Sequence, residues 1–472
     1  MTRCIVWLIV LLTGLPFGAV RAEDAAVDDV APSPWPGEAL AGGETTVFDR
    51  SHGAFGRALR NLERGRWLSM RAGKRLFETP WQVPDTTEGS SSLSGLGPRF
   101  NTVSCSGCHF RDGRGAPPAA IMASPEPAPP VVRLRRVDNG EPDPRYGAQL
   151  NDHGAGVPAE GRVTIEEVET LWRAVNGREH RLRRPRARLT ALALGPMHSH
   201  TRVDLRVPPT LVGLGLLEAV PVDQLEALAD PDDRDGDGIS GRLRRLADGT
   251  IGRFGWTAGQ SRLEAQVANA FHEDLGVTSD LRPDANCPPD DTVCRRLAGD
   301  AIELTSTQLQ RVALYTRLLA PPARRGWDEP AVLEGRDVFL RVGCGDCHVP
   351  SLRTASRDAS SAAQTHREIL PELADQTIWP YTDLLLHDLG PEMADDGVEP
   401  GVEPGEWRTA PLWGLGLHER VNGHLNLLHD GRARTVEDAI LWHGGEAAGS
   451  RDRFTELSTR EHEALLRFLE SL

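Results

Sequence analysis

Cys105-Ser-Gly-Cys108-His109 and Cys344-Gly-Asp-Cys347-His348 are the two stretches that decide how this chain of 472 residues folds. In each, two cysteines three apart are followed directly by a histidine, the spacing that attaches a c-type haem. The sulfurs bond the porphyrin edge and the histidine supplies one axial iron ligand. Zinc would need a second close Cys or His pair near each motif, which is missing. A redox-active Cys-x-x-Cys pair is the other alternative. We predict two covalently bound haems.

The first 22 residues have the pattern of a signal peptide. Arg3 provides the positive start, an apolar run follows from Ile5 to Leu12, and Ala22 ends a small-residue cleavage site. This run is too short to span a bilayer comfortably, and no later segment has 18 consecutive apolar residues. We therefore expect a periplasmic protein without a membrane span after removal of residues 1–22. Export agrees with c-type haem, which is attached outside the cytoplasm.

Two cysteines remain once the signal peptide, with Cys4, and the two haem motifs are set aside. They are Cys287 and Cys294, seven residues apart in a loop rich in Pro and Asp. In an oxidising compartment the sequence predicts a disulfide between them, worth about 2–3 kcal/mol by loop entropy. The alternative is a pair of free thiols.

The chain is acidic, with 53 Lys and Arg against 68 Asp and Glu and a formal net charge of −15. This balance argues against nucleic acid as a partner. It permits electrostatic steering of a small basic redox protein, such as a cytochrome c, as electron donor or acceptor.

The length and the two motifs indicate two cytochrome c-like haem domains. A flexible leader is expected at 23–45, an N-terminal domain with the first haem and insertions at 46–330, and a C-terminal domain with the second haem at 331–472. Strand signals are weak and aromatic residues make up only 5% of the chain. The fold class predicted is mainly α, with long irregular loops around the haems.

Helix signals are clearest in the last domain. Apolar residues from Val332 to Val342 favour a helix that leads into Cys344, and Ser458 with Glu461 forms a capping box for a final helix. Small c-type cytochromes close in this way, with a helix before the haem motif packing across the last helix.

Several longer phrases resemble the bacterial di-haem oxidoreductase, or di-haem peroxidase, family, whose members have also been labelled thiol oxidoreductases. The resemblance implies a haem oxidoreductase, similar more distantly to di-haem cytochrome c peroxidases and to the di-haem enzyme that matures a tryptophan-derived protein cofactor. It runs from about residue 55 to the end and rests on 95–101, 105–118, 209–218, 230–241, 252–256, 380–388, 406–409, 428–432 and 440–446.

The resemblance also implies a second axial ligand for the haem of His348. In the distant peroxidases that ligand lies fourteen residues after the His of a His-Asp-Gly motif. Here the motif begins at His429 and the position is His443. Thr435 with Asp438 resembles a capping box, and the helix it begins turns His443 inward. A core-packed histidine is the alternative. Met393 and His387 are the other candidate ligands, and His429 is expected beside the iron but not on it.

For the first haem, the distant peroxidases imply a Trp between the haems, a Gln ten residues later and a catalytic Glu after twenty. Trp256 and Gln266 match as electron relay and distal group, but Gly276 stands at twenty, so Glu273 or Asp274 is expected to move the proton. A core tryptophan and helix-surface polar residues are the plain alternative.

Two other functions remain open from the sequence. One is a non-catalytic di-haem electron carrier in which His200, His272 or Met197 caps the first iron. The other is oxidation of a protein or organic substrate in place of peroxide reduction.

Asp233, Asp235 and Asp237 alternate in a loop that turns at Gly238, which predicts a calcium site. Arg244 stands where an EF-hand needs Glu, so Ser240 or a remote carboxylate would have to complete the site. A solvated acidic turn is the alternative.

Overall fold

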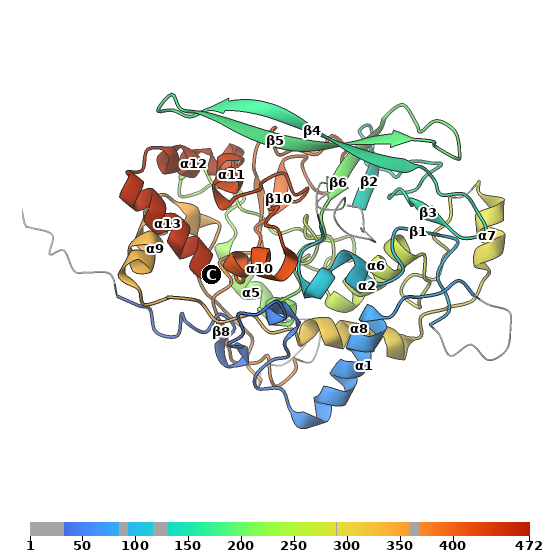
Figure 1. Cartoon of the computed structure of the whole chain (residues 1–472), viewed down its shortest axis with the longest axis horizontal. Coiled ribbons are helices and arrows are strands. Elements are labelled where there is room, and N and C mark those ends of the chain that lie inside the picture. The colour runs from blue at the N-terminus through green and yellow to red at the C-terminus, as the bar shows by residue number, and fades with distance from the viewer. Residues whose placement is uncertain (1–32, 85–92, 117–130, 289, 358–368) are drawn as a thin grey trace, which may run out of the picture.

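The computed structural model describes residues 33–84, 93–116, 131–288, 290–357 and 369–472 (Figure 1). The predicted signal peptide lies outside them. No described helix combines the length and apolar character needed to cross a bilayer. The α-helices are α1 Trp67–Glu78, α2 Cys105–Cys108, α4 Leu214–Glu218, α5 Val222–Leu228, α6 Leu263–Leu275, α7 Thr292–Ala298, α8 Ser306–Arg317, α9 Pro330–Arg341, α10 His418–Asn422, α11 Val436–Leu441, α12 Ala448–Thr455 and α13 Thr459–Ser471.

Strands are more prominent than the sequence predicted, and all described sheets are two-stranded and antiparallel. The pairs are β1 Arg99–Phe100 with β3 His153–Gly154, β2 Val131–Arg136 with β6 Thr201–Arg206, β4 Arg162–Arg173 with β5 Glu179–Thr190, β7 Leu352–Arg353 with β8 Thr377–Ile378, and β9 Leu386–Asp388 with β10 Glu406–Arg408. The expectation of a mainly α chain therefore holds only in part.

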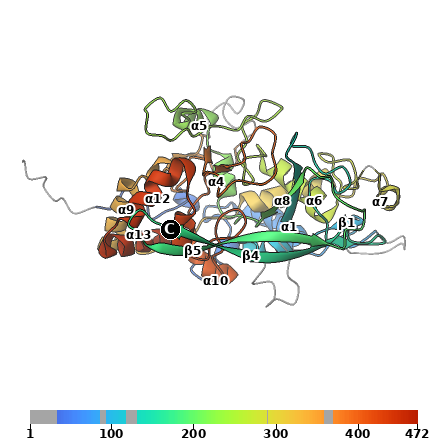
Figure 2. The same cartoon turned by 90° about the horizontal axis from the view of Figure 1, so that it is seen from above.

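Two helix pairs, α1 with α8 and α9 with α13, cross in the same way. A Cβ added at Gly73 in α1 would lie 2.0 Å from the Arg311 carbonyl oxygen of α8, and one added at Gly335 in α9 would lie 1.9 Å from the Ala464 carbonyl oxygen of α13. Only glycine permits so close an approach of backbones. In both views the two pairs lie on opposite sides of the molecule (Figures 1 and 2).

Local capping explains where the C-terminal helices begin. Ser458 and Glu461 form the predicted capping box of α13, and Pro330 occupies the first turn of α9, where its missing N–H costs nothing. The Thr435 side chain accepts a hydrogen bond from the Asp438 N–H at the start of α11. The capping box of α13 is confirmed. At α11 the Thr435 half of the predicted box is present, but the Asp438 carboxylate accepts from the Arg434 N–H instead of that of Thr435.

The β4–β5 hairpin runs along one edge of the molecule, from above α12 toward β6 and β2 (Figure 1). At one end Val163 and Ile165 pack on a cluster that contains β2 and β6, whereas nearer the tip Leu182 is buried among residues of the C-terminal half. Val163 and Leu182 lie on opposite faces of the ribbon, because Leu182 is paired with Thr170. The strong twist of a two-stranded ribbon turns a different face inward at each end.

Part of the predicted leader is packed on the protein. Glu38 is fully buried and forms ion pairs with Arg324 and Arg336, so the described residues 33–45 are not the free segment that their composition suggested.

The hydrophobic clusters contain residues from both sides of position 330. The predicted division into two domains at this position therefore stays a prediction.

We expect Gly335→Ala to lower the free energy of unfolding by about 1–3 kcal/mol, because the new methyl group would collide with the Ala464 carbonyl. Gly65→Ala is the control, since no atom lies within 4 Å of its added Cβ, and it should change stability by less than about 0.5 kcal/mol. Denaturant unfolding of both variants makes the comparison; equal stabilities would contradict the close crossing.

Candidate active site

One cavity of about 740 Å³ is lined by both Cys-x-x-Cys-His motifs. Helix α2 carries the first motif, and the Ser104 side chain caps it by accepting a hydrogen bond from the Gly107 N–H. The second motif follows α9, whose Phe339 also lines the cavity. The fold thus brings together two motifs that are more than 230 residues apart in the chain.

The four cysteines of the motifs are unpaired, whereas Cys287 and Cys294 form a disulfide. Burial raises the pKa of Cys105 and of Cys344 to about 12 and raises the pKa values of Cys108 and Cys347 as well. A redox-active Cys-x-x-Cys pair needs the opposite, a thiol whose pKa is lowered. Among the described residues, no group of three or more potential metal-ligand side chains includes these cysteines.

Three cavity histidines share one arrangement of their rings. A backbone carbonyl accepts from Nδ1 of each: Gly113 at 3.4 Å from His109, Tyr381 at 2.9 Å from His348, and Ala439 at 2.6 Å from His443. Burial lowers the pKa values of His109 and His348 to about 4 and also lowers that of His443. In His348 and His443 this arrangement leaves Nε2 available for a metal, whereas the Pro209 backbone also acts on the His109 ring.

Burial is the main cause of the lowered pKa of His348, and His443 lies close enough to lower it further, against the hydrogen bond to the Tyr381 carbonyl, which raises it. The competing candidate His387 is held by the Asp383 carboxylate at 2.8 Å and the Glu446 carboxylate at 2.7 Å. Although burial opposes its charge, these hydrogen bonds and one to Cys347 raise the pKa of His387 to about 12. An imidazolium with both nitrogens engaged cannot bind iron.

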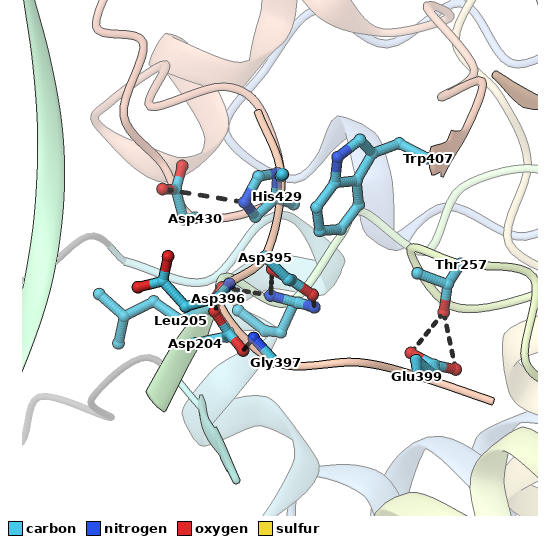
Figure 3. A network of polar contacts seen from close by, with 12 residues as sticks. Asp204, Leu205, Thr257, Asp395, Asp396, Gly397, Glu399, Trp407, His429 and Asp430 are labelled. Atoms are coloured by element: carbon cyan, nitrogen blue, oxygen red, sulfur yellow. Dashed lines mark hydrogen bonds and ion pairs between the residues drawn. The ribbon is translucent and has the colours of Figure 1, made fainter. Parts of the chain in front are cut away.

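Met393, the other candidate, is buried and its sulfur accepts from Arg432 at 3.4 Å. His429 also lines the cavity, and its ring stacks on Trp407 with centroids 3.7 Å apart (Figure 3). Burial and four surrounding arginines hold the pKa of His429 well below its usual value.

The wall beside His429 is strongly polar. Arg206 pairs with Asp395, the Asp204 carboxylate accepts from the backbone N–H groups of Asp396 and Gly397, and the Thr257 hydroxyl lies 3.1 Å from the Glu399 carboxylate (Figure 3). Each buried charge here has a partner of opposite sign or a hydrogen-bond donor.

Trp256 and Gln266 both line the cavity. The Trp256 indole donates from Nε1 to the Val207 carbonyl at 2.9 Å, and the Arg114 guanidinium lies 5.4 Å from the centre of its ring. Gln266 lies on α6, the helix that also carries Glu273 and Asp274.

Glu273 and Asp274 line the same cavity but differ in their surroundings. Burial would raise the pKa of Glu273, but its ion pair with Arg133 lowers it. Asp274 instead accepts from the Gln149 amide at 2.7 Å, and burial raises its pKa to about 6. Of these two neighbouring carboxyl groups, Asp274 is therefore the one whose pKa is raised toward neutral pH. Sequence left this choice open because Arg133 and Gln149 lie more than 120 residues away.

None of His200, His272 and Met197 is among the described residues that line the cavity. His418 does line it, and the sequence analysis missed it. Its ring is buried, its Nδ1 has no hydrogen-bond partner among the described residues, and burial lowers its pKa to about 3. Its helix α10 packs against residues 110–112, directly after His109.

The three aspartates of the acidic loop point toward one another, with one ligand atom of each within 4.8 Å of the others. The loop lies near the second motif: after burial, Asp237 raises the pKa of Asp346, and Ser240 donates to Glu446. Calcium binding stays a prediction from the sequence pattern.

Comparison with known proteins places these observations in a family. No curated protein matches the chain. A structure of hydrazine synthase from Kuenenia stuttgartiensis, pressurised with xenon, aligns over 100% of both chains with 14% sequence identity and a TM-score of 0.30. The family described as "Di-haem oxidoreductase, putative peroxidase" matches residues 38–159 and 196–472, which leaves out the hairpin β4–β5. The chain belongs to this di-haem oxidoreductase family.

Proposed function

We propose that this protein is an exported di-haem c-type oxidoreductase that reduces peroxide. The observation that carries the proposal is the single cavity lined by both Cys-x-x-Cys-His motifs, by three histidines whose Nδ1 atoms donate to backbone carbonyls, and by the Asp274 carboxyl group, whose pKa burial raises to about 6. The described residues fit two haems, because four protonated thiols and free Nε2 atoms are the groups that covalent attachment and iron ligation require.

The haems, when bound, would carry electrons and provide an iron site for peroxide. In this proposal His348 and His443 would both bind the second iron, which would suit it to receive electrons from a small redox protein. His109 would hold the first iron, and Trp256, which lies in the same cavity, would serve as the electron relay.

Reduction of one peroxide to two waters takes up two electrons and two protons. We assign the proton transfer to Asp274, since its carboxylate can take a proton from bound peroxide and return it to the departing oxygen. Gln266 would orient the substrate from the same helix. Glu273 is less suited, because Arg133 holds it ionised.

Export is part of the proposal. The Cys287–Cys294 disulfide supports it, because such bonds persist in oxidising compartments. The periplasm is also where a small redox partner would deliver electrons.

His443→Ala should convert one haem from low spin to high spin, because its iron would lose the sixth ligand. Electron paramagnetic resonance of the oxidised protein measures this change. His387→Gln is the control, and it should leave the spectrum unchanged because both ring nitrogens of His387 are held by carboxylates. A low-spin signal that survives His443→Ala would rule out the ligand assignment.

Asp274→Asn should lower peroxide turnover by about 10²–10⁴-fold, the usual contribution of a positioned proton-transfer group. In the native protein the carboxylate form appears as pH rises through about 6, so turnover should increase between pH 5 and 7. The variant should lose this increase, whereas Glu273→Gln should retain it. Turnover by Asp274→Asn with the native pH profile would contradict the assignment.

The proposal as a whole is tested with purified holoprotein, hydrogen peroxide and a reduced cytochrome c. Peroxide-dependent oxidation of the cytochrome should be abolished by His109→Gly and slowed strongly by Trp256→Ala. No peroxide-dependent spectral change in half-reduced protein would reject peroxidase chemistry.

A non-catalytic electron carrier is the second candidate, and the placement of His418 favours it. A buried neutral imidazole near the His109 segment could close the first iron. In that case both haems would be low spin in every redox state, and His418→Ala would open one of them. A high-spin first haem in the native protein supports the enzyme.

A further inference from the structure

Three buried arginines of the cavity lack a counter-ion. Arg114, Arg253 and Arg408 are 6%, 4% and 8% exposed, and all three line the cavity. Among the residues that the structure describes, none of the three forms an ion pair with a carboxylate. Burial lowers the pKa of each guanidinium to about 10.

The acidic groups that act on these arginines are each already engaged by another cation. Asp430, which acts on Arg114, pairs with Arg432 at 2.9 Å. Glu218, which acts on Arg253, pairs with Arg317.

The acid that acts on the third arginine, Arg408, is also paired with another cation. Asp383, which acts on Arg408, pairs with His387 at 2.8 Å. Each of the three arginines therefore shares its nearby carboxylate with another cation, and none forms an ion pair of its own among the described residues.

The remaining contacts of the three side chains are to backbone carbonyls. Arg114 donates to the Leu428 carbonyl at 2.7 Å and Arg253 to the Val220 carbonyl at 2.6 Å. Nε of Arg114 and Nη2 of Arg253 are buried without a hydrogen-bond partner. An unpaired buried charge costs several kcal/mol, so such groups normally bind an anion.

Two of the three arginines, Arg114 and Arg408, contact Trp256 or its neighbour Gly255. Arg114 lies over the Trp256 ring, and the Arg408 backbone N–H donates to the Trp256 carbonyl at 2.9 Å. The Arg408 side chain donates to the Gly255 carbonyl at 3.0 Å, and Arg253 stands three residues before Trp256 in the chain.

Two other arginines of the cavity, Arg133 and Arg206, do have carboxylate partners, and this changes the balance of effects on their pKa values. Burial lowers the pKa values of Arg133 and Arg206, but Glu273 and Asp395 raise them to a larger extent. The cavity thus holds arginines with carboxylate partners and, in Arg114, Arg253 and Arg408, buried arginines without them.

We propose that Arg114, Arg253 and Arg408 form a carboxylate-binding ring that holds the propionates of the two haems against Trp256 and raises their reduction potentials. This inference rests on the proposed binding of two haems. Arginine suits the role because its planar fork binds a carboxylate through two hydrogen bonds. Carboxylates bound to Arg114 and Arg408 would lie close to Trp256, the proposed electron relay.

The test is a spectroelectrochemical redox titration of the holoprotein with each arginine replaced by glutamine and by lysine. Glutamine removes the positive charge beside a propionate, so the midpoint potential of at least one haem should fall. Lysine keeps the charge and should restore most of the potential. Should a glutamine variant fail to accumulate, its lysine variant still shows a smaller shift of the same sign, because the bidentate contact is lost.

Arg325→Gln is the matched control. Burial lowers the pKa of Arg325 to about 10 and its guanidinium donates to chain carbonyls, but it does not line the cavity. Both potentials should be unchanged in this variant. Unchanged potentials in the variants of all three ring arginines would overturn the proposal.

Acetate distinguishes the propionates from a free carboxylate ligand. If the propionates fill the ring, acetate should leave both haem spectra of the native protein unchanged, whereas a saturable spectral change would show an open carboxylate site and overturn the assignment.

A pyridine haemochrome assay, which measures haem content, distinguishes a failure of the proposed function from a failure of the ring alone. A native protein without haem overturns the proposed function together with the ring, while two haems with unaltered variant potentials overturn the ring alone.

Discussion

Each Cys-x-x-Cys-His motif lies beside a pair of helices that cross without a side chain between them. Gly73 and Gly335 let α1 touch α8 and α9 touch α13, and four residues further along each first helix stands a phenylalanine. Phe77 lies 6.3 Å from the His109 ring and Phe339 lies 6.5 Å from the His348 ring. The helix crossing holds each phenylalanine in place, and the phenylalanine ring in turn limits the orientations of the neighbouring histidine ring.

The two crossings differ in one chemically important position. Phe77 packs on Tyr315 at 5.3 Å, and Phe339 packs on Phe468 at 5.2 Å, so tyrosine in the first half occupies the place of phenylalanine in the second. The Tyr315 hydroxyl donates to the Asp112 carboxylate at 2.6 Å. The first motif is therefore followed by a buried acid, in keeping with a proposal in which the two haems have different tasks.

Sequence predicted the features whose cause is local. Capping residues stand within three positions of the helix that they begin, so the starts of α11 and α13 could be placed correctly. The hairpin β4–β5 was missed because much of it is held by pairs such as Glu167 with Arg183, which look like ordinary surface charge until the strands are aligned. The choice between Glu273 and Asp274 also depended on distant partners. The motifs can be recognised from neighbouring residues in the sequence. Which charged groups pair with one another can be seen only in the folded cavity, because the partners are far apart in the chain.

The same reasoning explains why the ring arginines went unnoticed. Arg253 and Arg408 lie in short phrases that carry the family resemblance, where a tryptophan was the more conspicuous residue. Most arginines are exposed to solvent or paired with a carboxylate. Only the structure reveals that Arg114, Arg253 and Arg408 are buried and without an ion pair among the described residues.

The hairpin is the part of the fold that the family match leaves out, and its contacts show which part of the site it can influence. Arg184 of β5 donates to the Ala394 carbonyl, next to Asp395 in the polar wall of the cavity, and Arg434 pairs with Glu167 of β4. None of these contacts involves the histidines or cysteines of the two motifs. An added ribbon held in this way can alter the polar wall and the outer surface of the protein while the ligands of the proposed haems stay as they are in the family.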